Sequence, residues 1–93
     1  MQKASARHIL VDSEQECKDL KKQISEGADF AEIAKKYSQC PSGKDGGALG
    51  EFSPGQMVEE FDKVVFEEET GKVHGPIKTE FGYHLIEITD RTD

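Results

Sequence analysis

The segment "KTEFGYHLIEI", residues 78–88, has the pattern of a β-strand that closes a hairpin. Aromatic and β-branched residues dominate it, and the preceding "VHGPIK" (73–78) is also extended in character, so "TEFG" between them predicts a tight turn. Alternation along the second strand separates two sets of side chains: His84, Ile86 and Ile88 on one face, and Tyr83, Leu85 and Glu87 on the other. A titratable imidazole therefore lies on a face that otherwise resembles a core.

The chain upstream of the hairpin contains two further strands and three helices by the same criteria. "ARHILV" (6–11) carries apolar residues at both odd and even positions, and therefore on both faces of a strand. This predicts a strand that is covered on both sides. Ser13 with Glu16 forms a capping box for a helix that ends at Gly27, and Asp29 caps a second helix that runs to Tyr37. The glycine-rich stretch 41–50 predicts an irregular loop that leads into a short strand at 49–52 and a helix at 58–66.

These elements follow the order β-α-α-β-α-β-β. The short connections and the final hairpin favour an α+β fold, an antiparallel four-stranded sheet with helices packed around it, over a doubly wound parallel sheet. A chain of 93 residues is long enough for one compact core but too short for two. We therefore expect a single domain over residues 1–93.

The distribution of charge argues against nucleic acid as a partner. Residues 1–46 hold 8 basic and 8 acidic side chains, whereas residues 47–93 hold 4 and 11, so the second half carries the whole net charge of −7. Such a surface repels phosphate backbones. No apolar run reaches the ~18 residues of a spanning helix, and the start "MQKASAR" is polar, so we expect no membrane partner and a cytoplasmic, monomeric protein.

The cysteines and histidines have ordinary interpretations when each is taken alone. Cys17 and Cys40 lack the paired spacing of a disulfide framework or a zinc site, and Cys17 belongs on the apolar face of its helix. A histidine within a strand, as at His8 and His84, is more often a hydrogen-bonded core residue than a ligand, and we expect His74 to be structural or exposed. Cys40, before a proline at the entrance to the loop, fits a small apolar group and a reactive thiol equally well.

Four segments together resemble the parvulin family of peptidyl-prolyl cis/trans isomerases. They are "ARHILV" (6–11), "ADFAEIAKKYS" (28–38), "CPSGKDGGALGEFSPGQMVEEFDKVVF" (40–66) and "GPIKTEFGYHLIEI" (75–88), and they cover nearly the whole chain in the right order. The resemblance implies a parvulin/FKBP-like fold, isomerisation of X-Pro bonds in polypeptide substrates as an aid to folding, and no cofactor or metal.

The resemblance also implies roles for particular residues. His8 and His84 match the histidine pair that lies beneath the substrate proline, Cys40 matches the neighbouring cysteine or aspartate, and Thr79 matches the hydroxyl that bonds the pair. The matching positions of the proline pocket are Leu49, Met57, Phe61 and Phe81. Spacing alone indicates core packing for Phe61 and leaves Met57 undecided.

Three other functions use the same residues. A non-catalytic proline-peptide-binding or chaperone module on the same fold is the principal alternative. A Cys-His hydrolase based on Cys40 and His84 would need an orienting group and an oxyanion hole, and the sequence marks neither. A metal site formed by His8, Cys40 and His84 has suitable ligand types but lacks the residue spacing of a zinc site. Turnover of a proline peptide separates the isomerase from the binding module.

The loop after the first strand indicates which substrates the chain accepts. Phosphate-directed parvulins carry a basic loop there, whereas this chain has "VDSEQEC" (11–17) with three acids and no base before Lys18. We therefore expect apolar or basic residues before the proline to be preferred and phosphoserine to be disfavoured.

Overall fold

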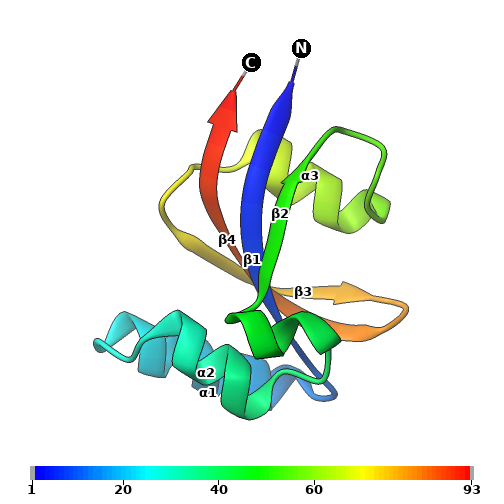
Figure 1. Ribbon diagram of the computed structural model, residues 1–93. Helices are drawn as coiled ribbons and strands as arrows, with labels where there is room; N and C mark the ends of the chain where they lie inside the picture. The colour runs from blue at the N-terminus through cyan, green and yellow to red at the C-terminus, as the bar shows by residue number, and fades with distance from the viewer. Residues whose placement is uncertain (1, 93) are drawn as a thin grey trace.

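The computed structural model describes residues 2–92, apart from the side chain of Ser42, and contains the predicted order of elements (Figure 1). The strands and helices are β1 (Lys3–Val11), α1 (Glu14–Ser25), α2 (Phe30–Tyr37), a short 3₁₀ helix η1 (Pro41–Asp45), β2 (Ala48–Phe52), α3 (Glu59–Glu67), β3 (Val73–Thr79) and β4 (Gly82–Thr92). The prediction β-α-α-β-α-β-β is confirmed.

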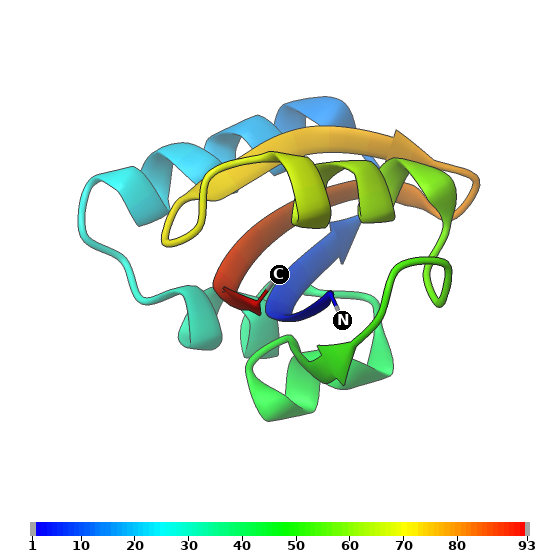
Figure 2. The ribbon, with the colours of Figure 1, turned by 90° about the horizontal axis from the view of Figure 1, so that it is seen from above.

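The strands form one antiparallel sheet in the order β2-β1-β4-β3. The strands β1 and β4 occupy the centre and pair along their length, from Lys3 opposite Thr92 to Val11 opposite Tyr83. The sheet is strongly curved when it is seen from above (Figure 2). The predicted α+β class is therefore confirmed, with the two ends of the chain reaching the sheet through its two central strands.

The sheet divides the apolar core of this single domain into two clusters, one on each face. One cluster joins α1 and α2 to the sheet: Ile9, Val11, Cys17, Leu20, Phe30, Ile33, Ala34 and Leu85. The other packs α3 against the opposite face, to which β2 contributes Phe52: Ala4, Ala6, Phe52, Phe61, Val65 and Ile86. The expectation that the first strand is covered on both sides is confirmed, and Cys17 is fully buried as predicted.

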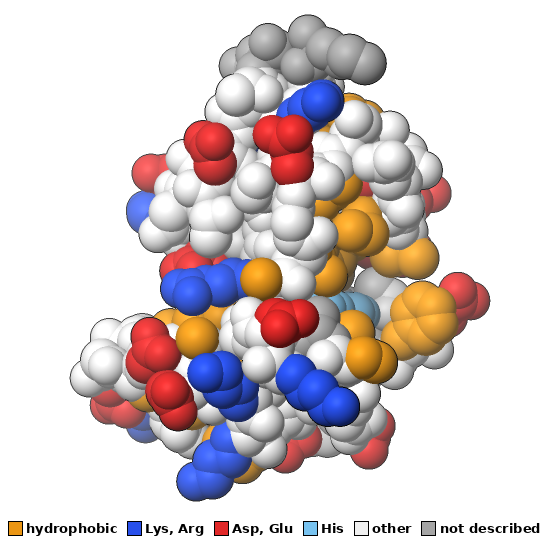
Figure 3. All heavy atoms as spheres, in the orientation of Figure 1, with side chains coloured by type: hydrophobic (Ala, Val, Ile, Leu, Met, Phe, Trp, Pro, Cys, Tyr) orange, Lys and Arg blue, Asp and Glu red, His pale blue; other side chains and the backbone are white. Residues whose placement is uncertain are grey.

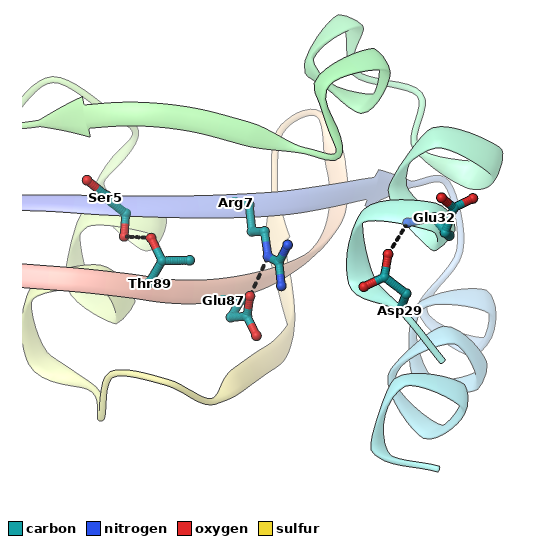
Figure 4. A network of polar contacts seen from close by, with 6 residues as sticks. All are labelled: Ser5, Arg7, Asp29, Glu32, Glu87 and Thr89. Atoms are coloured by element: carbon teal, nitrogen blue, oxygen red, sulfur yellow. Dashed lines mark hydrogen bonds and ion pairs between the residues drawn. The ribbon is translucent and has the colours of Figure 1, made fainter. Parts of the chain in front are cut away.

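The helices α1 and α2 begin at the predicted caps. The Ser13 hydroxyl accepts a hydrogen bond from the Glu16 N–H (3.0 Å), and the Asp29 carboxylate accepts one from the Glu32 N–H (3.2 Å), as Figure 4 shows for Asp29. These bonds satisfy backbone donors that the first turn of a helix leaves unpaired. The N-cap residue of α3, Val58, has no such side-chain bond.

Charged and polar side chains reinforce the β1–β4 pairing (Figure 4). Arg7 lies directly opposite Glu87, and its guanidinium donates to the Glu87 carboxylate. The same guanidinium lies 4.8 Å from the centre of the Phe30 ring, so it also connects the sheet to α2. The Thr89 hydroxyl donates to the Ser5 carbonyl (3.0 Å). Opposite charges in register favour this strand pairing over slipped alternatives.

The structure differs from the sequence-based prediction in two regions. Strand β1 begins at Lys3 rather than residue 6, because its polar first residues pair with the equally polar end of β4, which runs to Thr92. The glycine-rich stretch predicted as an irregular loop instead contains η1 and the start of β2 at Ala48. Among the helices described, none is long and apolar enough to cross a bilayer.

Candidate active site

A pocket of about 400 Å³ opens on the α3 side of the sheet. Its walls come from η1, α3, the segments that precede these two helices, and the β3–β4 turn, and its floor is the central pair of strands. Figure 3 shows histidine side chains at the bottom of this hollow, surrounded by hydrophobic side chains. The pocket is therefore an apolar cavity with a polar floor.

The register of β1 against β4 brings the two floor histidines together. His8 pairs with Ile86, and His84 lies two residues before Ile86 on the same face of β4, so the two imidazoles are diagonal neighbours. Their Nδ1 atoms are 3.1 Å apart, and the rings are nearly parallel, at 16° with centres 5.3 Å apart. Each histidine is only 5% exposed.

Thr79 extends this pair into a hydrogen-bond chain. Its hydroxyl lies 2.8 Å from His84 Nε2 and accepts a bond from the Phe81 N–H (3.2 Å). The hydroxyl is placed there by the tight β3–β4 turn, in which Thr79 pairs with Gly82. Both ring nitrogens of His84 are therefore engaged, one by His8 and one by Thr79.

Burial keeps both imidazoles neutral near pH 7. Desolvation, followed by repulsion from His84, lowers the pKa of His8 from 6.5 to about 4, and desolvation lowers the pKa of His84. One proton then lies between the two Nδ1 atoms, on either ring. Because a hydroxyl can donate or accept, the chain from Thr79 through His84 to His8 can run in either direction. The hydrogen-bond chain can thus reverse its direction without gaining a net charge.

Phe61 of α3 forms the apolar wall next to the two histidines. Its ring meets His8 and His84 edge to face, at centre distances of 5.7 and 6.1 Å, and it is 3% exposed. Leu49 and Met57 pack against the same core and line the pocket beside it. The prediction that Phe61 is a core residue is confirmed, and the same side chain also lines the pocket.

A clamp on β1 holds Cys40 at the pocket wall. The Ser38 hydroxyl accepts hydrogen bonds from the N–H groups of Leu10 (3.1 Å) and Cys40 (3.4 Å), and the Gln39 N–H donates to the Leu10 carbonyl (2.8 Å). The segment after α2 is thereby fixed to the strand that carries His8.

Gly47 fixes the other side of β1 at the same level. The His8 N–H donates to the Gly47 carbonyl (2.9 Å), and Gly47 has φ of +86°. A Cβ atom at this position would lie 2.3 Å from the His8 carbonyl oxygen, so only glycine allows the two backbones to approach this closely. This contact positions the backbone of His8 beneath the pocket.

Comparison with known proteins assigns the family. The family described as "Rotamase: PPIC-type PPIASE domain" matches residues 2–90. The chain belongs to the PPIC-type, or parvulin, family of peptidyl-prolyl isomerases. The resemblance inferred from the sequence is confirmed, and the parvulin domain described here is a peptidyl-prolyl cis/trans isomerase domain.

The relatives of this parvulin domain include long and short proteins. The foldase protein PrsA of Geobacillus kaustophilus is 46% identical over 90 residues, which are 96% of this chain and 32% of that protein. The crystal structure of PrsA from Bacillus anthracis has a TM-score of 0.95 and 39% identity, covering 99% of this chain and 43% of that one. The parvulin of Nitrosopumilus maritimus has a TM-score of 0.87 and 36% identity, and the match covers 97% of this chain and 98% of that one. The chain spans about a third of the length of the curated relatives it matches.

The structure brings together, in and beside one pocket, every residue that the resemblance indicated. The predicted residues that line the pocket are His8, Cys40, Leu49, Met57, Phe61, Phe81 and His84, and Thr79 lies behind them on His84. Four further residues line it without having been predicted: Leu10, Gln39, Pro41 and Val58. Leu10 could have been found, because it shares a strand face with His8, whereas the others depend on how the loops fold.

The geometry bears on the two other chemistries considered. A Cys-His hydrolase needs a histidine nitrogen available to the thiol, yet both nitrogens of His84 already have partners. Within the part of the chain that the structure describes, no group of three or more His, Cys, Asp or Glu side chains could hold a metal ion. The arrangement suits binding of a neutral apolar ring above adjustable hydrogen-bonding groups.

Proposed function

We propose that this domain isomerises X-Pro bonds of polypeptides during folding, with a preference for apolar or basic residues before the proline. The observation that supports this most directly is the apolar pocket of about 400 Å³ above two buried imidazoles. A hollow of this kind accepts a pyrrolidine ring by burying its apolar surface.

The reaction requires rotation about an amide and no cofactor. The barrier is about 18–20 kcal/mol because twisting removes amide resonance, which leaves the nitrogen more amine-like and the carbonyl less polarised. Rate enhancement then comes from binding the twisted amide more tightly than either planar isomer. A preference of about 5–7 kcal/mol accelerates the reaction ~10⁴ to 10⁵-fold.

Each group of the site has a role in this proposal. Leu49, Met57, Phe61 and Phe81 hold the proline ring, while the rest of the peptide rotates past the polar groups. Thr79, His84 and His8 form a neutral network that keeps the floor rigid. Cys40 contributes a polar thiol at the wall and forms no covalent bond to the substrate.

The charges around the pocket support the substrate preference. Asp12, Glu14 and Glu16 follow β1 at the position where a phosphate-directed site would need bases. Further acids flank the pocket in sequence: Glu51, Glu59, Glu60 and Glu80. A phosphate or carboxylate directly before the proline would enter this negative field, whereas an apolar or basic side chain would not.

A panel of short X-Pro peptides tests the proposal by protease-coupled or NMR exchange kinetics. We expect high kcat/KM for Leu-Pro, Phe-Pro, Arg-Pro and Lys-Pro, lower values for Glu-Pro, and the lowest for phosphoSer-Pro. The charge-dependent part of the ranking should shrink as salt screens it. Equal or faster turnover of the phosphorylated peptide at low ionic strength would refute the proposed preference.

A non-catalytic peptide-binding or chaperone module remains the alternative. The Phe81 ring is 62% exposed at the pocket rim, as a surface for holding unfolded chains would require. Binding without turnover of any peptide in the panel would establish this alternative. Cytoplasmic location and the monomeric state remain predictions, and sedimentation of the purified chain tests the second.

A further inference from the structure

A second hollow lies directly against the proline pocket. Gln39, Cys40 and Pro41 line both, so this segment forms a wall between them. The second hollow, which we call the lysine groove, is bounded on its far side by Lys35 of α2 and Lys44 of η1. A polypeptide whose proline occupies the first hollow can cross this wall into the second.

The cationic groups of the lysine groove are available to a ligand. Both lysines are exposed, and neither forms an ion pair with any residue within 2–92. Asp45 follows Lys44 in the chain, but no ion pair joins it to Lys44 or Lys35. Figure 3 shows Lys and Arg side chains below the pocket, over α2 and η1, with Asp and Glu side chains among them.

Ser38 also lines the lysine groove and offers a hydroxyl donor there. Its oxygen accepts from the N–H groups of Leu10 and Cys40, which occupies both lone pairs. Its hydroxyl proton has no acceptor among the residues that the structure describes, and Ser38 lines the groove. Two ammonium groups and one hydroxyl donor match the acceptor-only chemistry of a carboxylate.

Charged residues of opposite sign adjoin the two sides of the active site in sequence. The acids Glu59, Glu60 and Glu80 adjoin pocket residues of α3 and the β3–β4 turn, whereas the wall on the opposite side leads to Lys35 and Lys44. A bound polypeptide that crosses from one side to the other experiences a change in the sign of the potential. Such a field orients a chain that carries an acidic residue on one side of its proline.

We propose that the lysine groove is a second substrate subsite, which takes the carboxylate of an Asp or Glu two or three residues from the bound proline. This distance is set by the reach of an extended chain, in which two or three residues span roughly 7–10 Å. The inference rests on the proposed isomerase function. It adds a preference for an acidic residue two or three positions away from the proline. The residue directly before the proline stays in the negative field described above.

The test is a set of peptides that differ only in the place of one charge. Each has Leu-Pro at its centre, with Glu or the isosteric Gln placed in turn two or three residues before or after the proline. We expect kcat/KM for Glu to exceed that for Gln by about threefold to tenfold at one side of the proline, the size expected for two exposed ion pairs. The double variant Lys35→Glu/Lys44→Glu should remove or reverse this ratio.

The parent peptide and a matched variant separate the possible failures. Lys22→Glu/Lys36→Glu makes the same change in net charge on α1 and α2 without altering a groove residue, and should keep the Glu/Gln ratio of the wild type. Failure to turn over the parent Leu-Pro peptide would refute the isomerase function itself. If the parent is turned over but the ratio is near one at every position, or falls equally in both double variants, the subsite does not exist.

Discussion

His8 and His84 both leave water when the chain folds, which makes stability depend on pH. Above pH 6.5 the His8 imidazole is neutral in both the folded and the unfolded states. In that range its titration does not affect the free energy of unfolding. Below pH 6.5 the unfolded chain binds a proton that the folded chain does not bind until about pH 4, so stability is lost as the pH falls through this window. A pKa shift of this size corresponds to up to about 3 kcal/mol.

Denaturant titrations of the wild type and His8→Asn at pH 7 and pH 4.5 measure this effect. We expect the wild type to lose more stability than His8→Asn between the two pH values, because the variant lacks the group that titrates. The control is His74→Asn, since His74 is partly exposed and lies outside the pocket. An unchanged difference between wild type and His8→Asn across this range would contradict the burial of a neutral imidazole.

Cys40 provides a second prediction at the level of single residues. If the thiol acts only as a polar group in the wall, Cys40→Ser should keep kcat/KM within about tenfold of the wild type, a change of ~1.4 kcal/mol in transition-state binding. The peptide assay measures this on a variant shown to be folded by circular dichroism. Complete loss of activity in folded Cys40→Ser, together with a trapped covalent adduct on the wild type, would favour nucleophilic attack.

The sequence identifies the residue types of the site but not their proximity. His8 and His84 are 76 positions apart, and their contact depends on the β1–β4 register, which cross-strand pairs such as Arg7–Glu87 help to set. Strand patterns give the face of each histidine but not this register. Only the resemblance to parvulins indicated that the two rings are neighbours.

The loop between β2 and α3 decides the shape of one pocket wall. The Asp62 carboxylate in the first turn of α3 accepts a hydrogen bond from the Gly55 N–H (2.6 Å), and the Gln56 side chain accepts one from the Ser53 N–H (2.6 Å). Both bonds hold the segment that presents Met57 to the proline. Asp62 therefore acts as a positioning residue for the pocket.

Removing this anchor should weaken substrate binding more than turnover. We expect Asp62→Ala to raise KM by about tenfold with a smaller change in kcat, since a hydrogen bond to a charged group contributes roughly 1.5–3 kcal/mol. Asp62→Asn retains an acceptor oxygen and should recover most of the binding. Lys63→Ala, the next residue of α3, serves as the matched control. If the Asn variant is no better than the Ala variant, the bond does not position the loop.

Local signals predict the helices and strands well because their causes are local. Ser13 and Asp29 cap the helices that their spacing indicated, and apolar periodicity gives the buried faces. Tertiary contacts decide what was missed. The Ser38 clamp depends on the position of Leu10, and the close approach of Gly47 to His8 depends on β2 pairing with β1, so neither leaves a pattern in neighbouring residues.

At the scale of the whole molecule, the two apolar clusters are joined through the same central strands. Ile9 of β1 belongs to the cluster beneath α1 and α2, while the adjacent His8 faces the opposite cluster and the pocket. Leu85 and Ile86 of β4 divide in the same way. A change in either cluster therefore acts on the strands that carry the active-site histidines.

The pairing of Lys3 with Thr92 determines how the domain responds to mechanical force. When Lys3 and Thr92 are pulled apart, the force acts only on the nearest β1–β4 hydrogen bonds. These bonds then break one after another, so the two strands unzip. Force applied between Val11 and Thr92, at opposite ends of the paired strands, instead loads every bond together in shear. In an optical trap with handles at each pair of positions, we expect the first geometry to rupture at clearly lower force. Equal rupture forces would mean that the β1–β4 ladder does not bear the load.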